Sequence, residues 1–146
     1  MKGIAALIEG KPLVLAKSSE NVREVARRMT DRNVGAVAVL DGEKLVGMFT
    51  ERDLMTRAVA VNLDLDKTQI DKVMTRELVT AGPGEAIAEC LQKMHKLNCR
   101  HLPVVDRGNL VGMISLRDLL QIDSQQAKQR AKLLGELVTY SPDYES

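Results

Sequence analysis

The chain has 146 residues and a formal net charge of +1, with 45% hydrophobic and 28% charged residues. These values fit a globular protein of one ordinary domain or two small ones, and the balanced charge gives no electrostatic case for nucleic acid or an anionic membrane as partner. No apolar run approaches a membrane-spanning length, and with no Trp, one Phe and two Tyr the sequence is not expected to stack on single-stranded nucleic acid.

The first half of the chain predicts a mixed helix and strand pattern. We expect a short helix at residues 3–10 closed by Gly10, then a strand at 13–16. Ser18 and Ser19 offer N-caps for a helix that ends near 31–33, with apolar residues at helical spacing at Val22, Val25, Ala26 and Met29. Strands at 36–40 and 45–50 flank a turn at 41–42, and a helix follows at 51–61, with Leu54, Ala58 and Val61 aligned on one face.

The same order of elements then restarts. We expect a helical turn at 70–74, a strand at 78–81 and a helix opened by residues 83–85, with Ile87, Cys90, Leu91 and Met94 facing inward. Strands at 102–105 and 110–115 flank a turn at 107–108, and a last helix begins near Leu116. Residues 124–138 form an amphipathic helix without a counterpart in the first half, and residues 140–146 are expected to fray.

The two halves are copies of one unit. Residues 13–54 match residues 78–119 without a gap, and the identical pairs include Glu20 with Glu85 and Asn33 with Asn98. An ungapped match predicts an α/β (α+β) fold of two β-α-β-β-α repeats, packed with pseudo-twofold symmetry around two related clefts. We expect repeat 1 at 1–65, repeat 2 at 66–122, and the extra C-terminal helix and tail at 123–146.

Each repeat contains a hydroxyl residue followed three positions later by Asp at the start of a predicted helix. These pairs are Thr50 with Asp53 and Ser115 with Asp118. One interpretation is a helix capping box, which is purely structural. The other is a ligand site, because a helix N-terminus attracts anions and a carboxylate there can accept the hydroxyl groups of a ribose. The two interpretations are compatible.

The paired units, each ending in Gly-Met-(Phe/Ile)-(Thr/Ser)-x-x-Asp, resemble the tandem cystathionine β-synthase (CBS) domain over residues 3–122. The segment 100–104 also matches that family's second strand. The resemblance implies a regulatory module that binds AMP, ADP or ATP, or in some members S-adenosylmethionine, NAD(H) or cyclic dinucleotides, and that commonly forms a disc-shaped homodimer. The chain looks most like the stand-alone two-repeat members of bacteria and plant organelles.

The resemblance also implies the residues that contact the ligand. The ribose would bind Asp53 or Asp118, and the phosphates would approach arginines, which suit phosphate through paired hydrogen bonds but are more often solvated surface charges. Further contacts would come from the first strand and from the start of the second strand of each repeat. The candidates are Lys17, Gly35, Ala36, Thr50, Arg52, Asp53, Arg57, Thr80, Arg100, His101, Pro103, Ser115, Arg117 and Asp118.

Other chemistries find little support. Cys90, His95, Cys99 and His101 match no paired metal-ligand spacing, so we expect no metal site and a structural Cys90. Two cysteines suit a reducing cytoplasm. No Gly-rich phosphate loop, acid–base pair or catalytic triad can be assembled, so we expect a sensor that requires no cofactor rather than an enzyme. The alternative is a scaffolding module with unoccupied clefts, and in either case the C-terminal helix could mediate dimer contacts or partner docking.

Overall fold

In the computed structural model, which describes residues 3–139, each half of the chain is built on an antiparallel strand pair. β2 (Ala36–Asp41) pairs with β3 (Lys44–Thr50), and β4 (His101–Asp106) pairs with β5 (Asn109–Ser115). Both pairs shift register at equivalent positions, between Val39 and Leu40 and between Val104 and Val105. The predicted mixed fold of two related repeats is therefore confirmed.

The third strand is where the two repeats differ. β1 (Leu15–Lys17) pairs in parallel with β2, but the strand predicted at 78–81 is wrong, because only Ala81 bridges to Val104. The Ala81 N–H donates to the Pro103 carbonyl and the Val105 N–H donates to the Ala81 carbonyl. The next ladder bonds on either side would need N–H groups at Pro83 and Pro103, and proline has none.

The helix of repeat 1 that packs on the sheet begins later than predicted. α2 (Val22–Arg32) is capped by Asn21, whose side chain accepts from the Glu24 N–H at 2.9 Å, so the predicted Ser18 and Ser19 caps are wrong. The Ser18 N–H instead donates to the Leu40 carbonyl and extends the β1–β2 ladder. α2 and its counterpart α4 (Ile87–Leu97) both end in a left-handed asparagine, at Asn33 and Asn98.

The helix predicted at 51–61 changes type along its length. It starts as α3 (Glu51–Asp53) and continues as a π-helix, η1 (Leu54–Val59). Ala58 is buried, whereas Val61 lies beyond the helix and is 57% exposed, so the predicted inward position of Val61 is wrong. The wider π-turn has a different residue period from the α-helix on which that prediction was based.

Each hydrophobic core contains a short segment that comes from the other half of the chain. α1 (Ala5–Ile8) lies beside the second repeat, and Ile4 is buried in that repeat's core. The 3₁₀ turn η2 (Ile70–Lys72) lies on the first repeat, and Ile70 is buried in the first core. The attachments correspond: the Ile4 N–H donates to the Glu85 carbonyl at 3.0 Å, and the Ile70 N–H donates to the Glu20 carbonyl at 2.8 Å.

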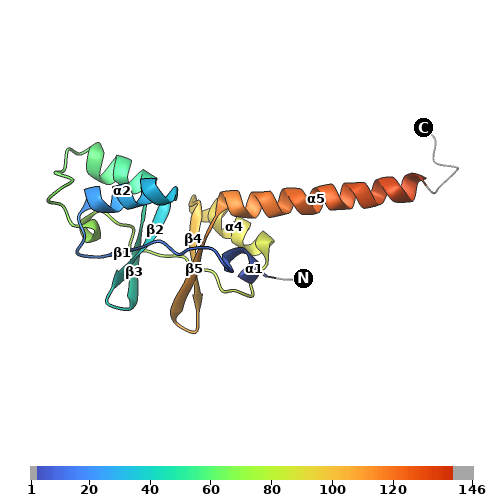
Figure 1. Cartoon of the computed structure of the whole chain (residues 1–146), viewed down its shortest axis with the longest axis horizontal. Helices are drawn as coiled ribbons and strands as arrows, with labels where there is room; N and C mark the ends of the chain where they lie inside the picture. The colour runs from blue at the N-terminus through green and yellow to red at the C-terminus, as the bar shows by residue number, and fades with distance from the viewer. Residues whose placement is uncertain (1–2, 140–146) are drawn as a thin grey trace.

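The last helix projects from the body of the molecule (Figure 1). α5 (Leu116–Thr139) runs without a break, so the amphipathic helix predicted at 124–138 is the continuation of the helix that starts at Leu116. Every residue from 123 to 135 is exposed, including Leu133 and Leu134. The predicted fraying at 140–146 falls outside the described residues. No helix within residues 3–139 is long and apolar enough to cross a membrane.

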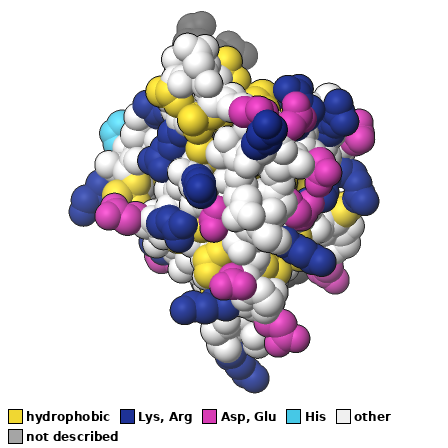
Figure 2. All heavy atoms as spheres, turned by 90° about the vertical axis from the view of Figure 1, so that its left-hand side faces the viewer, with side chains coloured by type: hydrophobic (Ala, Val, Ile, Leu, Met, Phe, Trp, Pro, Cys, Tyr) yellow, Lys and Arg dark blue, Asp and Glu magenta, His cyan; other side chains and the backbone are white. Residues whose placement is uncertain are grey.

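The surface at the end of the molecule opposite α5 carries mixed charge. Figure 2 shows Lys and Arg side chains interspersed with Asp and Glu over this face, which belongs to the first repeat. This face therefore offers no continuous basic surface of the kind that favours binding to nucleic acid.

Candidate functional site

The aspartates of the two motifs sit in different surroundings. Asp53 is buried, with 8% of its side chain exposed, and both of its oxygens are occupied. The Thr50 N–H donates to Oδ2 at 3.1 Å, and the Thr75 hydroxyl lies 3.0 Å from Oδ1 and 3.1 Å from Oδ2. The Arg57 Nε adds a longer contact of 3.5 Å to Oδ1. Asp53 thus completes a capping box and a structural network.

Thr75 reaches Asp53 because its backbone is paired with the edge strand β3. The Thr75 N–H donates to the Met48 carbonyl at 2.8 Å, and the Met48 N–H donates to the Thr75 carbonyl at 2.9 Å. Gly47 permits this close approach, since a Cβ there would lie 2.9 Å from the Thr75 oxygen and 2.5 Å from the Met74 sulfur. The segment that contains Met74 and Thr75 therefore covers the Asp53 carboxylate of the first repeat.

Asp118 has the same capping box but a more open carboxylate, with 27% of its side chain exposed. The Ser115 N–H donates to Oδ2 at 3.2 Å, and the Asp118 N–H donates to the Ser115 hydroxyl at 3.1 Å. Lys11 forms an ion pair with the same Oδ2. Oδ1 accepts no hydrogen bond from any residue between 3 and 139, so it is available to a ligand.

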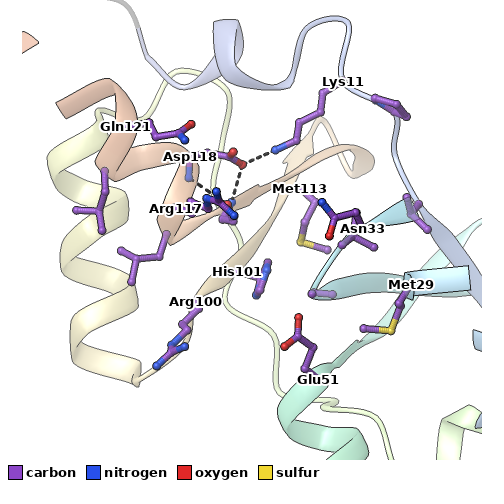
Figure 3. Close-up of a pocket in the computed structure, with 18 of the residues that line it drawn as sticks. Lys11, Met29, Asn33, Glu51, Arg100, His101, Met113, Arg117, Asp118 and Gln121 are labelled. Atoms are coloured by element: carbon purple, nitrogen blue, oxygen red, sulfur yellow. Dashed lines mark hydrogen bonds and ion pairs between the residues drawn. The ribbon is translucent and has the colours of Figure 1, made fainter. Parts of the chain in front are cut away.

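Asp118 lies on the wall of a cleft of about 1560 Å³ between the two repeats. The start of α5 and the first residues of β4 form one side, and α2 with the start of β2 forms the other. Figure 3 shows Lys11 reaching Asp118 from the loop after α1, and His101 and Glu51 pointing toward one another across the cleft. The apolar lining comes from both repeats and includes Val14, Ala26, Met29, Leu54, Met113 and Leu116.

Two strand beginnings meet in this cleft. Gly35 and Ala36 precede and start β2, and Arg100 and His101 hold the equivalent positions at β4. A Cβ on Gly35 would lie 2.7 Å from Glu51 Oε1 and 3.3 Å from His101 Cε1. The absence of a side chain at Gly35 therefore leaves the space that Glu51 and His101 share.

The charged groups of the cleft are predominantly basic. Its lining contains Lys11, Arg100, Arg117 and Lys128 against Glu51 and Asp118, a formal surplus of two positive charges with His101 neutral. Burial lowers the pKa of His101, although the carboxylates of Glu51 and Asp118 oppose that shift. Burial raises the pKa of Asp118, but the bonds from Lys11 and Ser115 outweigh it, so the pKa lies below its usual value.

The predicted site residues divide into two groups. Seven line the cleft at Asp118: Gly35, Ala36, Arg100, His101, Ser115, Arg117 and Asp118. Of the others, Thr50 and Arg57 support Asp53, Arg52 and Lys17 are exposed, and Pro103 is buried in β4. Thr80 is half-buried, and its carbonyl accepts from Lys93. Gly35 and Ala36 belong to the first repeat, but they line the cleft that contains Asp118 of the second repeat.

Sequence reasoning missed several cleft residues. Lys11 was not anticipated because nothing in the pattern indicates that the N-terminal segment packs on the second repeat. For Glu51, the sequence pattern predicts only the first residue of a helix. The sequence pattern predicts a separate helix at 124–138, whereas the continuous helix α5 brings four polar side chains to the cleft, those of Gln121, Ser124, Gln125 and Lys128.

The cysteines belong to the packing. Cys90 is fully buried in the second core, and burial raises the pKa of both the Cys90 and the Cys99 thiols. Raised values oppose the thiolate form needed for nucleophilic chemistry or metal binding. Among residues 3–139, no cluster of three or more His, Cys, Asp or Glu side chains is arranged to hold a metal ion.

Comparison with known proteins finds the CBS domain model matching residues 8–60 and 70–124. The CBS domain-containing protein YhcV of Bacillus subtilis is 38% identical over 101 residues, which cover 69% of this chain and 71% of YhcV. The chain spans only 19% of the length of a plant relative, the CBS domain-containing protein CBSCBSPB5 of Arabidopsis thaliana, at 36% identity.

Comparison with solved structures also finds CBS domain proteins. The CBS domain pair of protein MJ0100, in complex with 5′-methylthioadenosine and S-adenosyl-L-methionine, has 28% identity and a TM-score of 0.77, covering 86% of this chain and 98% of that one. The CBS domain protein PAE2072 from Pyrobaculum aerophilum, complexed with AMP, has 30% identity and a TM-score of 0.73, covering 81% and 89%.

Proposed function

This chain belongs to the CBS domain family, and from that premise we propose that it is a non-catalytic regulatory module that binds an adenosine-containing nucleotide in the cleft at Asp118. The observation that carries the proposal is the pair of motif aspartates. Asp53 is sealed by Thr75, whereas Asp118 faces a cleft with one carboxylate oxygen unbonded among the described residues.

The cleft supplies the three kinds of contact that such a nucleotide needs. Asp118 would accept ribose hydroxyl groups at Oδ1. Arg100 and Arg117 would bind phosphate, and neither forms an ion pair with any residue between 3 and 139. Apolar side chains of α2 and of the segment that precedes β1, Met29 and Val14, would pack against the adenine. The complexes of the two similar proteins, with AMP and with S-adenosyl-L-methionine and 5′-methylthioadenosine, support this ligand class.

Regulation would follow from the position of the cleft. Both repeats line it, so a bound ligand contacts both halves at once and favours the relative placement that suits it. A ligand at a hundred times its dissociation constant would stabilise the bound form by about 2.7 kcal/mol. That free energy is available to bias how the module meets a second copy or a protein partner.

Isothermal titration calorimetry with AMP, ADP, ATP, S-adenosylmethionine and 5′-methylthioadenosine tests the proposal, with GMP as a control for the base. Arg117→Gln should weaken binding of the phosphorylated ligands by roughly fivefold, as expected for a partly solvated charged contact. Arg52→Gln is the matched control, because Arg52 holds the equivalent place in repeat 1 but lies outside the cleft lining. Absence of binding by any adenosine compound would refute the proposal, and so would equal losses from both variants.

A further inference from the structure

One face of α5 continues the cleft beyond the motif aspartate. Four residues on this face line the cleft, and we call them the α5 stripe: Arg117, Gln121, Ser124 and Lys128. Arg117 and Lys128 are 11 residues apart, which is about three helical turns, so their side chains leave the helix in nearly the same direction. Leu120 and Gln125 flank the stripe and also line the cleft.

The composition of the stripe suits an extended anion. A cation stands at each end, with an amide and a hydroxyl group between them as hydrogen-bond donors. Neither Arg117 nor Lys128 forms an ion pair within the part of the chain that the structure describes, in contrast to Lys11, which is held by Asp118. Both cations are therefore free to meet a charged ligand.

The dimensions favour a ligand longer than a nucleoside monophosphate. The axial rise of an α-helix places Arg117 and Lys128 about 16 Å apart along α5. Helical side chains lean toward the N-terminus of their helix, which directs the Lys128 ammonium group back over the cleft. The volume of about 1560 Å³ also exceeds the ~300–1000 Å³ of an ordinary small-molecule pocket, so a mononucleotide would leave room in it.

We propose that the α5 stripe binds the phosphate tail of a nucleoside di- or triphosphate, so that the cleft prefers ATP to AMP. The inference rests on the proposed function, since it takes the adenosine to lie at Asp118. Arg117 would hold one end of the tail and Lys128 the other, and the hydroxyl and amide groups between them would donate to phosphate oxygens. The stripe then selects among adenosine ligands by the number of their phosphates.

Titration with ATP and AMP at one ionic strength, without magnesium so that the tail keeps its charge, tests the inference. The wild-type protein should bind ATP roughly fivefold more tightly than AMP, the size expected of one partly solvated charged contact. Lys128→Gln should remove this preference by lowering the affinity for ATP. Lys132→Gln is the matched control, because Lys132 lies one turn further along α5, is exposed and does not line the cleft.

The possible results separate a failure of phosphate binding at the α5 stripe from a failure of nucleotide binding in the cleft. Equal affinity of the wild-type protein for ATP and AMP, or loss of the ATP preference in both lysine variants, would refute phosphate-tail binding by the α5 stripe and leave the proposed function intact. Failure of both nucleotides to bind overturns both. Since Lys128 and Lys132 are exposed, neither substitution should disturb folding, and thermal unfolding of both variants should match the wild-type protein.

Discussion

Replacing each motif aspartate by alanine should separate structure from ligand binding. Asp53→Ala removes the bond from the Thr50 N–H, about 1 kcal/mol, and leaves the half-buried Thr75 hydroxyl without its acceptor, about 1–3 kcal/mol more. Asp118→Ala also loses one capping bond, from Ser115, but otherwise only an ion pair with Lys11 that contributes about 0–1 kcal/mol.

For a chain of this size, about 1 kcal/mol corresponds to roughly 3 °C in the midpoint of thermal unfolding. Asp53→Ala should therefore lower the midpoint by about 6–12 °C and Asp118→Ala by about 3–6 °C. Ligand binding should show the opposite order. A ribose hydroxyl bonded to a carboxylate contributes about 1.5–3 kcal/mol, so Asp118→Ala should weaken AMP binding by roughly 10- to 150-fold.

Scanning calorimetry and AMP titration of the two variants provide the assay, with binding measured well below both midpoints. Asp53→Ala should retain an AMP affinity within a few-fold of the wild-type value. The reasoning would be refuted if the variants weakened AMP binding equally, or if Asp118→Ala lowered the midpoint as much as Asp53→Ala did. Either result would mean that the two carboxylates have the same role.

Two further substitutions test the fold. Burial raises the pKa of Glu85, but the ion pair with Lys93 and the hydrogen bond from the Gly82 N–H outweigh it, so the pKa in the folded state lies below its usual value. The ionised Glu85 therefore stabilises the fold fully above pH ~4.5, and this stabilisation is lost as the pH falls through the pKa of the folded state. Glu85→Gln should reduce the loss of stability that urea titrations measure between about pH 5 and 3. Gly47→Ala should destabilise by about 1–3 kcal/mol in denaturant unfolding, because its methyl group meets the Thr75 backbone oxygen; an unchanged midpoint would contradict the close approach.

The repeat was the most predictable part of the molecule. The ungapped match between the halves predicted both strand pairs and both capping boxes, because alternation and capping are local properties. The strand at 78–81 failed for a reason that local patterns do not contain. Pro83 and Pro103 are visible in the sequence, but their effect depends on which N–H groups the parallel ladder requires, and that depends on register.

The candidate site was only half predictable. Asp53 and Asp118 have the same motif, and nothing near either residue in sequence indicates that one is sealed and the other open. The difference comes from segments far along the chain, since Thr75 covers the first carboxylate and Lys11 approaches the second. Lys128 escaped prediction for a related reason: its role depends on α5 continuing straight from the motif, so that a residue beyond the repeat still faces the cleft.

The exchange of α1 and η2 has a consequence for how the chain unfolds. Ile4 completes the core of the second repeat, and Ile70 completes the core of the first. Melting either repeat would release the segment that closes the other, since each repeat carries part of its neighbour's interior. Each repeat has a core of its own, but neither core is complete without a segment from the other half of the chain. The two repeats are therefore expected to unfold as one cooperative unit.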